Sequence, residues 1–449
     1  MVWVVIGQRQ PLLIGKVIID MLSPKSIAAA VLSFVVIIAL ALHYFVPAPP
    51  KKIVIATGGK TGQYFRLGNE YKEALEKNGI QVEILVTKGS IENLELLNDS
   101  NSQVDLAFVQ SGTSSSKEYP QIQSLAGVFY EPLWIVYRDK SFKATPDTLD
   151  DLVKKKVSIG VSGSGTRKLV ERIFALDQIK TDAPNFFAFN TDQSLEKLQA
   201  GEIDAMFISV NNRAQIMQKI FSDPQLKIMS FSKAYGYPPR IKGLSVLQVK
   251  RATLDVYNDS PSKDILMLSS TAELVSRKNL HPAITSLVVD LSIDMLSQAD
   301  ILNAEKEFPS PNHLSFDTNE DAQKVLREGP GFLHRYLPFW VAVWIDRLFR
   351  VAIPLAAILI PLFNFLPSIL QYRIKYKFAM IYKELYSIEN QVNAGKYEKG
   401  QVNISLQDLL DRSMLLKVSQ FNTKDVYDLL AHIGDVQRRV AEEKKNLIE

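Results

Sequence analysis

The stretch KIVIATGGKTGQYFRLG, residues 52–68, joins an apolar run to a glycine-rich turn and the start of an amphipathic segment. The apolar run is rich in β-branched residues, which are typical of a strand, and glycine permits the tight turn. The residues after the turn have helical spacing. A helix that starts directly after such a turn presents unpaired N–H groups, which favour an anion. The stretch therefore predicts a strand–turn–helix unit with a ligand-binding turn.

The turn does not fit the phosphate-binding motifs of nucleotide-binding proteins. A P-loop needs a second glycine upstream of Gly-Lys-Thr, and Val54 stands at that place. The spacing of Gly58, Gly59 and Gly62 also differs from the dinucleotide-binding pattern, and no acidic residue stands where a ribose would be bound. We therefore expect the turn to hold a small anion and not a nucleotide.

The composition excludes several classes of protein. The chain has 449 residues, is 47% hydrophobic and carries a formal net charge of +4, which fits a folded protein and argues against a nucleic-acid partner. Cysteine is absent, so disulfides, thiolate metal sites and cysteine nucleophiles are ruled out. The five histidines are scattered, with no spacing that puts two on one helical face. We expect no metal site and no cofactor.

Two long apolar runs predict transmembrane helices. The first covers residues 26–46, and the second covers residues 348–370 and is uncharged from Val351 onward. Each is long enough to cross a bilayer, and the prolines of the second run are tolerated in membrane spans. A buried helix in a soluble core is the alternative interpretation.

The distribution of lysine and arginine predicts how these spans are oriented. Basic residues precede the first run and follow the second, which favours cytoplasmic ends for a protein of the inner (plasma) membrane. Residues 1–25 then form a cytoplasmic lead, and residues 51–335 form an extracytoplasmic, periplasmic domain. Residues 371–449 form a cytoplasmic tail, in which NAGKYEKGQVN reads as the turn of a helical hairpin. The tail is either a solvated hairpin or a docking element for a partner protein.

The domain between the two runs alternates between predicted strands and helices. After the opening unit, IQVEILVT and VDLAFVQSG read as strands and SIENLELLNDS as a helix capped by Ser90. This βαβαβ order predicts an α/β fold with a mainly parallel, doubly wound sheet. A similar series returns in KKVSIGVSGSGTRKLVERIFAL and SLEKLQAGEIDAMFISV. Between the two series, LAGVFYEPLWIVYRD predicts a strand that leaves one lobe for the other.

Two lobes connected in this way predict a cleft that closes around a small anionic or zwitterionic solute. The candidate ligand residues stand at the expected strand ends and helix starts, or on the connecting strand. For the hydroxyl residues at helix starts, a role as helix cap or turn is the alternative, and for the aromatic residues a place in the core. The candidates are Thr61, Tyr64, Ser90, Asn93, Gln110, Ser111, Tyr130, Ser162, Ser164 and Thr166, with Trp134 as a further wall of the pocket.

A set of motifs, in this order along the chain, resembles the TAXI type of solute-binding protein of TRAP transporters. They are TGGKTGQYFRLG, TKGSIENLELL, VDLAFVQSG, GVFYEPLWIVYR, IGVSGSGTRKL and GEIDAMFI. LHPAI, EFPSPN and GFLHRYLPFWVAVWIDRL resemble the membrane-tethered branch of that family. The resemblance implies a two-lobed, periplasmic-binding-protein-like fold. It also implies capture of an organic anion, glutamate-like or a dicarboxylate, for a separate TRAP-type permease.

The sequence thus predicts a membrane-anchored solute receptor and not an enzyme. The serine of GSG lacks the glycine spacing of a nucleophile elbow, and the acidic pair Asp150 and Asp151 stands in a solvated, lysine-flanked stretch. One departure from the family pattern is Arg66, which places an extra cation near the expected cleft. A membrane receptor that senses a ligand and signals through the helical tail is the alternative function.

Overall fold

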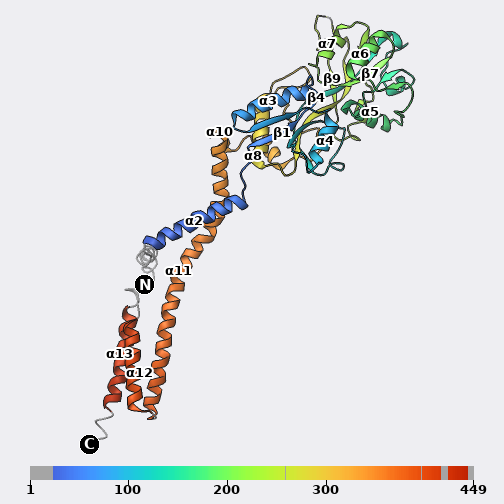
Figure 1. Ribbon diagram of the computed structural model, residues 1–449. Helices are drawn as coiled ribbons and strands as arrows, with labels where there is room; N and C mark the ends of the chain where they lie inside the picture. Colours follow the sequence, from blue (N-terminus) through green and yellow to red (C-terminus); the bar gives the residue numbers. More distant parts are fainter. Residues whose placement is uncertain (1–23, 258, 396, 416–422, 443–449) are drawn as a thin grey trace, which may run out of the picture. The chain divides into compact units, whose positions relative to one another are not determined.

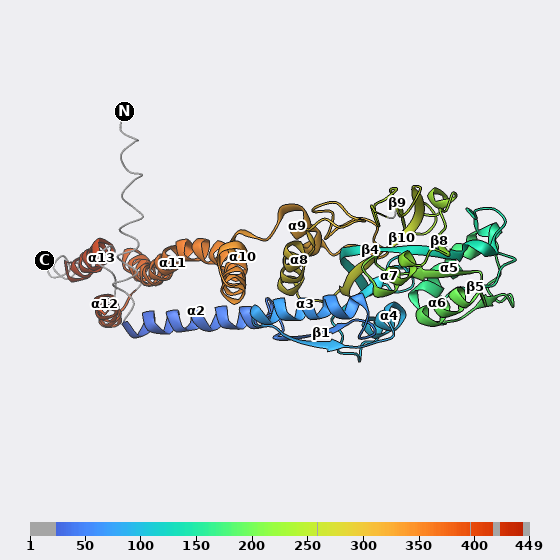
Figure 2. The same cartoon turned by 90° about the horizontal axis from the view of Figure 1, so that it is seen from above.

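The computed structural model describes residues 24–257, 259–395, 397–415 and 423–442 (Figure 1). The chain divides into two compact units. One unit is Pro47–Arg347, and the other is formed by the described residues before and after it. The Pro47–Arg347 unit contains one mixed sheet of ten strands, whose helices lie on both faces (Figure 2).

The first lobe is built on three parallel strands in the order β2-β1-β3. Side chains of β1 alternate between two cores, because successive residues of a strand point to opposite faces. Ile53 and Ile55 pack with α3 and α8, whereas Val54 and Ala56 pack with α4. The elements of this lobe are β1 (Lys52–Ala56), α3 (Gln63–Lys77), β2 (Gln81–Leu85), α4 (Ser90–Asn98), β3 (Leu106–Gln110), α8 (Pro282–Leu296), α9 (Glu320–Glu328) and α10 (Phe332–Tyr336).

The second lobe repeats this construction. Its parallel strands are β6, β5 and β7, and two apolar cores again lie on opposite faces of the sheet. The helices and strands are β5 (Val157–Ser158), α5 (Gly165–Leu176), β6 (Phe186–Phe187), α6 (Thr191–Ala200), β7 (Ala205–Ser209), α7 (Gln215–Ser222), β8 (Leu226–Ile228) and β9 (Ser245–Val249). Short 3₁₀ turns lie at Asp139–Ser141, Leu149–Asp151 and Ala234–Gly236.

Two long strands connect the lobes. β4 (Ile122–Arg138) pairs with β10 (Ile265–Arg277) as far as Pro132, and from Leu133 onward it pairs with β7 of the second lobe. β10 pairs with β9 up to Ser269 and then joins β3 of the first lobe. The crossing strand predicted from LAGVFYEPLWIVYRD is therefore confirmed. The expectation of a mainly parallel sheet is wrong, because both crossing strands run antiparallel to their neighbours.

The strand–turn–helix order predicted for the opening stretch is confirmed. β1 ends at Ala56, α3 begins at Gln63, and the chain leaves α3 through Gly79, whose φ of +76° lies in the left-handed region that favours glycine. The N-terminal end of α4 differs from the prediction. Its N-cap is Gly89, with no side-chain cap, so Ser90 is the first helical residue and does not cap the helix.

The second unit is helical. It contains α2 (Pro24–Tyr44), most of α11 (Phe339–Asn393), α12 (Lys399–Met414) and α13 (Thr423–Glu442). α11, α12 and α13 share one apolar core, so the predicted hairpin is in fact three helices. The sequence signal that was missed is Thr423 followed by Asp425, which marks a new helix start.

Within the described ranges, no helix meets the length and apolarity that a membrane span requires. The two predicted spans are therefore not confirmed.

Candidate functional site

The two crossing strands meet a cluster of polar side chains, Tyr64, Gln110, Glu131, Ser209 and Ser270, which we call the hinge cluster. The side-chain Nε2 of Gln110 donates to Ser209 Oγ at 2.6 Å and to Ser270 Oγ at 2.8 Å. Both serine hydroxyls donate to the main-chain oxygen of Glu131, at 3.3 and 3.0 Å. Tyr64 donates to Glu131 Oε2 at 2.8 Å. The cluster therefore joins both lobes through hydrogen bonds at the crossing point.

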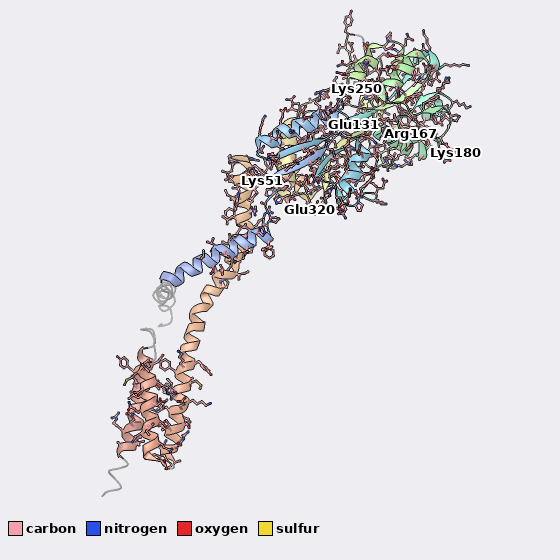
Figure 3. The ribbon with its side chains drawn as sticks, in the orientation of Figure 1. Lys51, Glu131, Arg167, Lys180, Lys250 and Glu320 are labelled. Atoms are coloured by element: carbon pink, nitrogen blue, oxygen red, sulfur yellow. The ribbon has the colours of Figure 1, made fainter. Side chains whose placement is uncertain are left out.

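Glu131 lies on β4 near the point where this strand passes from the first lobe to the second (Figure 3), and its side chain is buried. Burial raises its pKa to about 7, and the hydrogen bond from Tyr64 lowers it in part. Burial, followed by the charge of Glu131, holds the pKa of the Tyr64 hydroxyl well above its usual value. A carboxyl group of this kind exchanges a proton near neutral pH, and it repels an anion placed next to it once it has lost that proton.

A cavity of about 280 Å³ lies beside the hinge cluster and takes its lining from both lobes; we call it the interlobe cavity. The first lobe contributes Ile91 at the start of α4 and the segment from Thr113 to Tyr119. The second lobe contributes the Ser162–Ser164 turn and the first turns of α5. Hydroxyl groups from two lobes thus face one space, which is an arrangement suited to a small polar ligand.

The start of α5 brings two basic side chains, Arg167 and Lys168, to the lining of the interlobe cavity. Ser164 is the N-cap of α5, and its Oγ accepts from the main-chain N–H of Arg167 at 3.1 Å. Arg167 is 16% exposed in its side chain and donates from Nε to Glu171 at 2.6 Å. Lys168 also lines the cavity. Glu118 and Glu171 in the same lining match these two positive charges, and Glu118 accepts from Ser114 at 2.6 Å.

A second cavity of about 180 Å³ lies along α3. Arg66, the extra cation noted in the sequence, lines it and lies 3.7 Å from Glu70. Arg213 of the second lobe lies in the same lining and pairs with Asp300 of the first lobe at 3.0 Å. The two arginines are thus each matched by a carboxylate in this cavity.

Several predicted ligand residues line a cavity or join the hinge cluster. Ser162 and Ser164 line the interlobe cavity, and Tyr64 and Gln110 belong to the hinge cluster. Ser90 and Thr166 lie next to that cluster, because Ser90 Oγ accepts from the Gln110 main chain at 2.9 Å and Thr166 Oγ1 accepts from that of Ser209 at 3.3 Å.

The other predicted ligand residues lie elsewhere. Thr61 is exposed in the turn before α3, whose N-cap is Gly62. Asn93 is fully buried and donates to two main-chain carbonyls. Ser111 is buried and donates to the Gly243 carbonyl at 2.6 Å.

The aromatic candidates on β4 are buried. Tyr130 donates to Glu307 at 2.6 Å and packs edge-on against Phe308. Trp134 is fully buried and packs edge-on against Phe221 in a core of the second lobe. These contacts match the core interpretation that the sequence left open for both residues.

Sequence reasoning missed Glu131, Ser209, Ser270 and Arg167. Glu131 had a readable signal, because it is the single charged residue between Leu125 and Tyr137 in the apolar run that predicts the crossing strand. The two serines gave no signal of their own, since each stands in a strand and is defined only by its partners across the sheet.

No curated protein sequence is significantly similar to this chain. Among solved structures, an ancestral arginine-binding protein bound to arginine is 14% identical over 55% of this chain and 93% of its own, with a TM-score of 0.36. The effector-binding domain of QuiR in complex with shikimate is 14% identical over 55% of this chain and 96% of its own, with a TM-score of 0.35. The P235GK mutant of ArgBP from T. maritima is 13% identical over 55% of this chain and 89% of its own, with a TM-score of 0.35.

The family comparison covers both lobes. The model of the NMT1-like family matches residues 55–280, which run from β1 through the second lobe to the end of β10. These residues supply the hinge cluster and the whole lining of the interlobe cavity. The chain belongs to the NMT1-like family.

Proposed function

We propose that the Pro47–Arg347 unit is a solute-binding receptor, and not an enzyme, that captures a small organic anion in the interlobe cavity. The observation that carries the proposal is the lining of this cavity by both lobes. A solute held there contacts Thr113 and Ser114 of the first lobe and the start of α5 in the second lobe at the same time. Such a solute binds the closed form better than the open form, which is how a two-lobed receptor signals occupancy.

The chemistry of the lining favours a carboxylate. The hydroxyl groups and the N-terminal end of α5 donate hydrogen bonds to an anion. Arg167 uses its Nε–H for Glu171, and the other N–H groups of its guanidinium are the ones we assign to the solute. Glu118 in the same lining favours a solute that also carries an ammonium group. A glutamate-like solute therefore fits better than a dicarboxylate.

The transport part of the proposal rests on the sequence. The motifs that resemble TAXI proteins support delivery of the solute to a TRAP-type permease. An anchor in the inner membrane, with the lobes in the periplasm and both chain ends in the cytoplasm, is supported by the uncharged run at residues 26–46 and by the basic residues that flank the two runs. Apolar side chains exposed along α2 add support: Leu32, Val35, Ile37 and Leu40. Alkaline carbonate extraction tests the anchor, because an anchored protein stays in the membrane pellet.

A second function is favoured by one observation on α11. The first residues of this helix, Phe339 and Val343, belong to the core of the first lobe, and its later residue Leu385 belongs to the core of the three-helix tail. One continuous helix therefore takes part in both cores, which suits a receptor that signals from its ligand domain to its tail. Solute-dependent change in the hydrogen exchange of the tail would favour this function over simple uptake.

Thermal unfolding of the full-length protein with amino acids, dicarboxylates, 2-oxoacids and nucleotides tests the receptor. A solute at a thousand times its Kd adds about 4 kcal/mol to the unfolding free energy. We expect a hit among the acidic amino acids, with its Kd then measured by calorimetry. Arg167→Met should raise that Kd about tenfold or more, since it removes a charged hydrogen bond. Lys250→Ala, a substitution outside the lining of the interlobe cavity (Figure 3), is the matched control.

Two outcomes would contradict the receptor. One is stabilisation by a nucleotide and by none of the organic anions. The other is a solute whose Kd is the same in the Arg167→Met variant and in the wild type, because that solute binds outside the interlobe cavity.

A further inference from the structure

Gln110 crosses from the first lobe into the second. It is the last residue of β3, and its side chain is buried. Each of its two amide N–H groups has a partner: Ser209 at the end of β7 in the second lobe, and Ser270 on the crossing strand β10. Each serine then donates to Glu131 on the other crossing strand. The amide thus connects the first lobe, the second lobe and both crossing strands in one closed set of hydrogen bonds.

The amide oxygen of Gln110 lies against the first residue of α5. A Cβ atom added to Gly165 would lie 2.2 Å from Gln110 Oε1, which is far inside van der Waals contact. The amide therefore reaches the N-terminal end of α5 only because residue 165 has no side chain. This end of a helix carries unpaired N–H groups and favours an oxygen acceptor.

The next two residues of the first lobe also bond to the second lobe. Ser111 donates to the Gly243 carbonyl at 2.6 Å, and Arg172 on α5 donates to the Gly112 carbonyl at 2.5 Å. The main-chain N–H of Gly112 donates to Ser315 Oγ of the first lobe at 2.7 Å. Three consecutive residues, the last residue of β3 and the two that follow it, thus make direct contacts between the lobes of the kind that a bound solute usually supplies in a two-lobed receptor.

We propose that Gln110 is an intramolecular clasp that holds the two lobes closed without a solute, by placing its own amide at the start of α5. In a receptor without such a clasp, part of the binding energy of the solute is used to close the lobes. Its apparent affinity is therefore the affinity of the closed form multiplied by the fraction of solute-free molecules that are closed. A clasp removes this reduction. Gln110 is then a closing residue and not a ligand residue, which differs from the role that its place in the sequence predicted.

The test measures the distance between the lobes in the full-length protein without solute. The chain contains no cysteine, so Lys117→Cys in the first lobe and Lys180→Cys in the second give two unique nitroxide positions, both exposed. Double electron–electron resonance should show one narrow distance distribution. Gln110→Met keeps the volume of the side chain but removes its hydrogen bonds. It should lower the ratio of closed to open molecules by roughly tenfold to a hundredfold.

Gly165→Ala provides an independent route to the same effect, because the added Cβ displaces the amide of Gln110 and not the backbone. The double variant should open the lobes no further than either single variant. Gln121→Ala, an exposed glutamine of the first lobe, is the matched control and should leave the distribution unchanged. A broad, open distribution in the wild type would overturn the clasp. An unchanged distribution in Gln110→Met, or additive effects in the double variant, would do the same.

Discussion

The hinge cluster and the interlobe cavity contain similar residue types in opposite situations. In the hinge cluster, hydroxyl, amide and carboxyl groups are buried and bond to one another across the two lobes. In the interlobe cavity, Ser162 is exposed and Arg167 is partly exposed, and both face a space of about 280 Å³. Polar groups that already have partners hold a structure together, whereas polar groups that face open space can bind something else. We therefore expect substitutions in the hinge cluster to change the stability of the protein, and substitutions in the lining of the interlobe cavity to change its affinity for a solute.

The same comparison divides the candidate ligand residues into residues that stabilise the fold and residues that can contact a solute. Asn93 and Ser162 were both chosen for their place near a helix start. Asn93 is fully buried with two carbonyl partners, and Ser162 faces the interlobe cavity. Substitutions should therefore separate them, with a loss of stability at the first and a loss of affinity at the second.

The largest effect is expected from Asn93→Ala. Asn93 Nδ2 donates to the carbonyls of Thr57 and Phe108 at 2.6 and 2.8 Å, and its Oδ1 accepts from Thr87 at 2.7 Å. Truncation leaves these buried groups without a partner, so the unfolding free energy should fall by about 3 kcal/mol. Urea denaturation measures this loss, and Asn98→Ala at the exposed end of the same helix is the control. A raised solute Kd with unchanged stability would instead make Asn93 a ligand residue.

Glu131→Gln should give the next largest effect, which develops as the pH rises from about 4.5 to about 7. Burial raises the pKa of Glu131 from 4.5 to about 7 in the folded protein. Between these values the folded protein holds a proton that the unfolded chain has lost. The stability that this proton contributes is complete below the unfolded pKa and is lost as the pH rises through about 7. Glutamine cannot ionise, so the variant lacks this loss.

The measurement for Glu131 is the unfolding free energy between pH 5 and pH 8. Relative to the wild type, Glu131→Gln should gain about 2 kcal/mol over this range. Glu273, a second buried carboxyl whose pKa is raised to about 7 by burial, titrates in both proteins and cancels from the difference. Glu320→Gln, on an exposed residue, is the control. Parallel pH profiles for the variant and the wild type would show that the Glu131 carboxyl is ionised throughout.

The sequence predicted the parts of the fold that depend on nearby residues. The strand, turn and helix of residues 52–68 are local, and so is the helix start at Ser164. The crossing strand β4 was predictable because its apolar run is longer than one lobe needs. The expectation of a mainly parallel sheet was wrong because the relative direction of two strands depends on which strands pair. Some of these strands are far apart in the sequence, such as β3 and β10.

The hinge cluster was even harder to predict from the sequence, because its residues are far apart along the chain. Tyr64 and Glu131 are 67 residues apart, and Gln110 and Ser270 are 160 residues apart. Their contact depends on the register of two strands that cross between the lobes, which no local pattern records. The interlobe cavity was easier to predict, since its lining comes partly from a single turn, Ser162–Ser164, that has its own sequence signature.

The smallest effect is expected from Arg213→Ala, which removes the ion pair with Asp300 between the lobes. The side chain of Arg213 is 55% exposed, so the pair should contribute only about 0.5 kcal/mol to the unfolding free energy, and less at high salt. Lys250→Ala removes an exposed pair with Asp264 inside the second lobe and is the matched control. A pair between lobes also favours the closed form, whereas a pair within one lobe does not. Arg213→Ala should therefore raise the solute Kd by about twofold at low salt, and Lys250→Ala should leave it unchanged. Equal Kd values for the two variants would mean that the Arg213 pair does not contribute to closure.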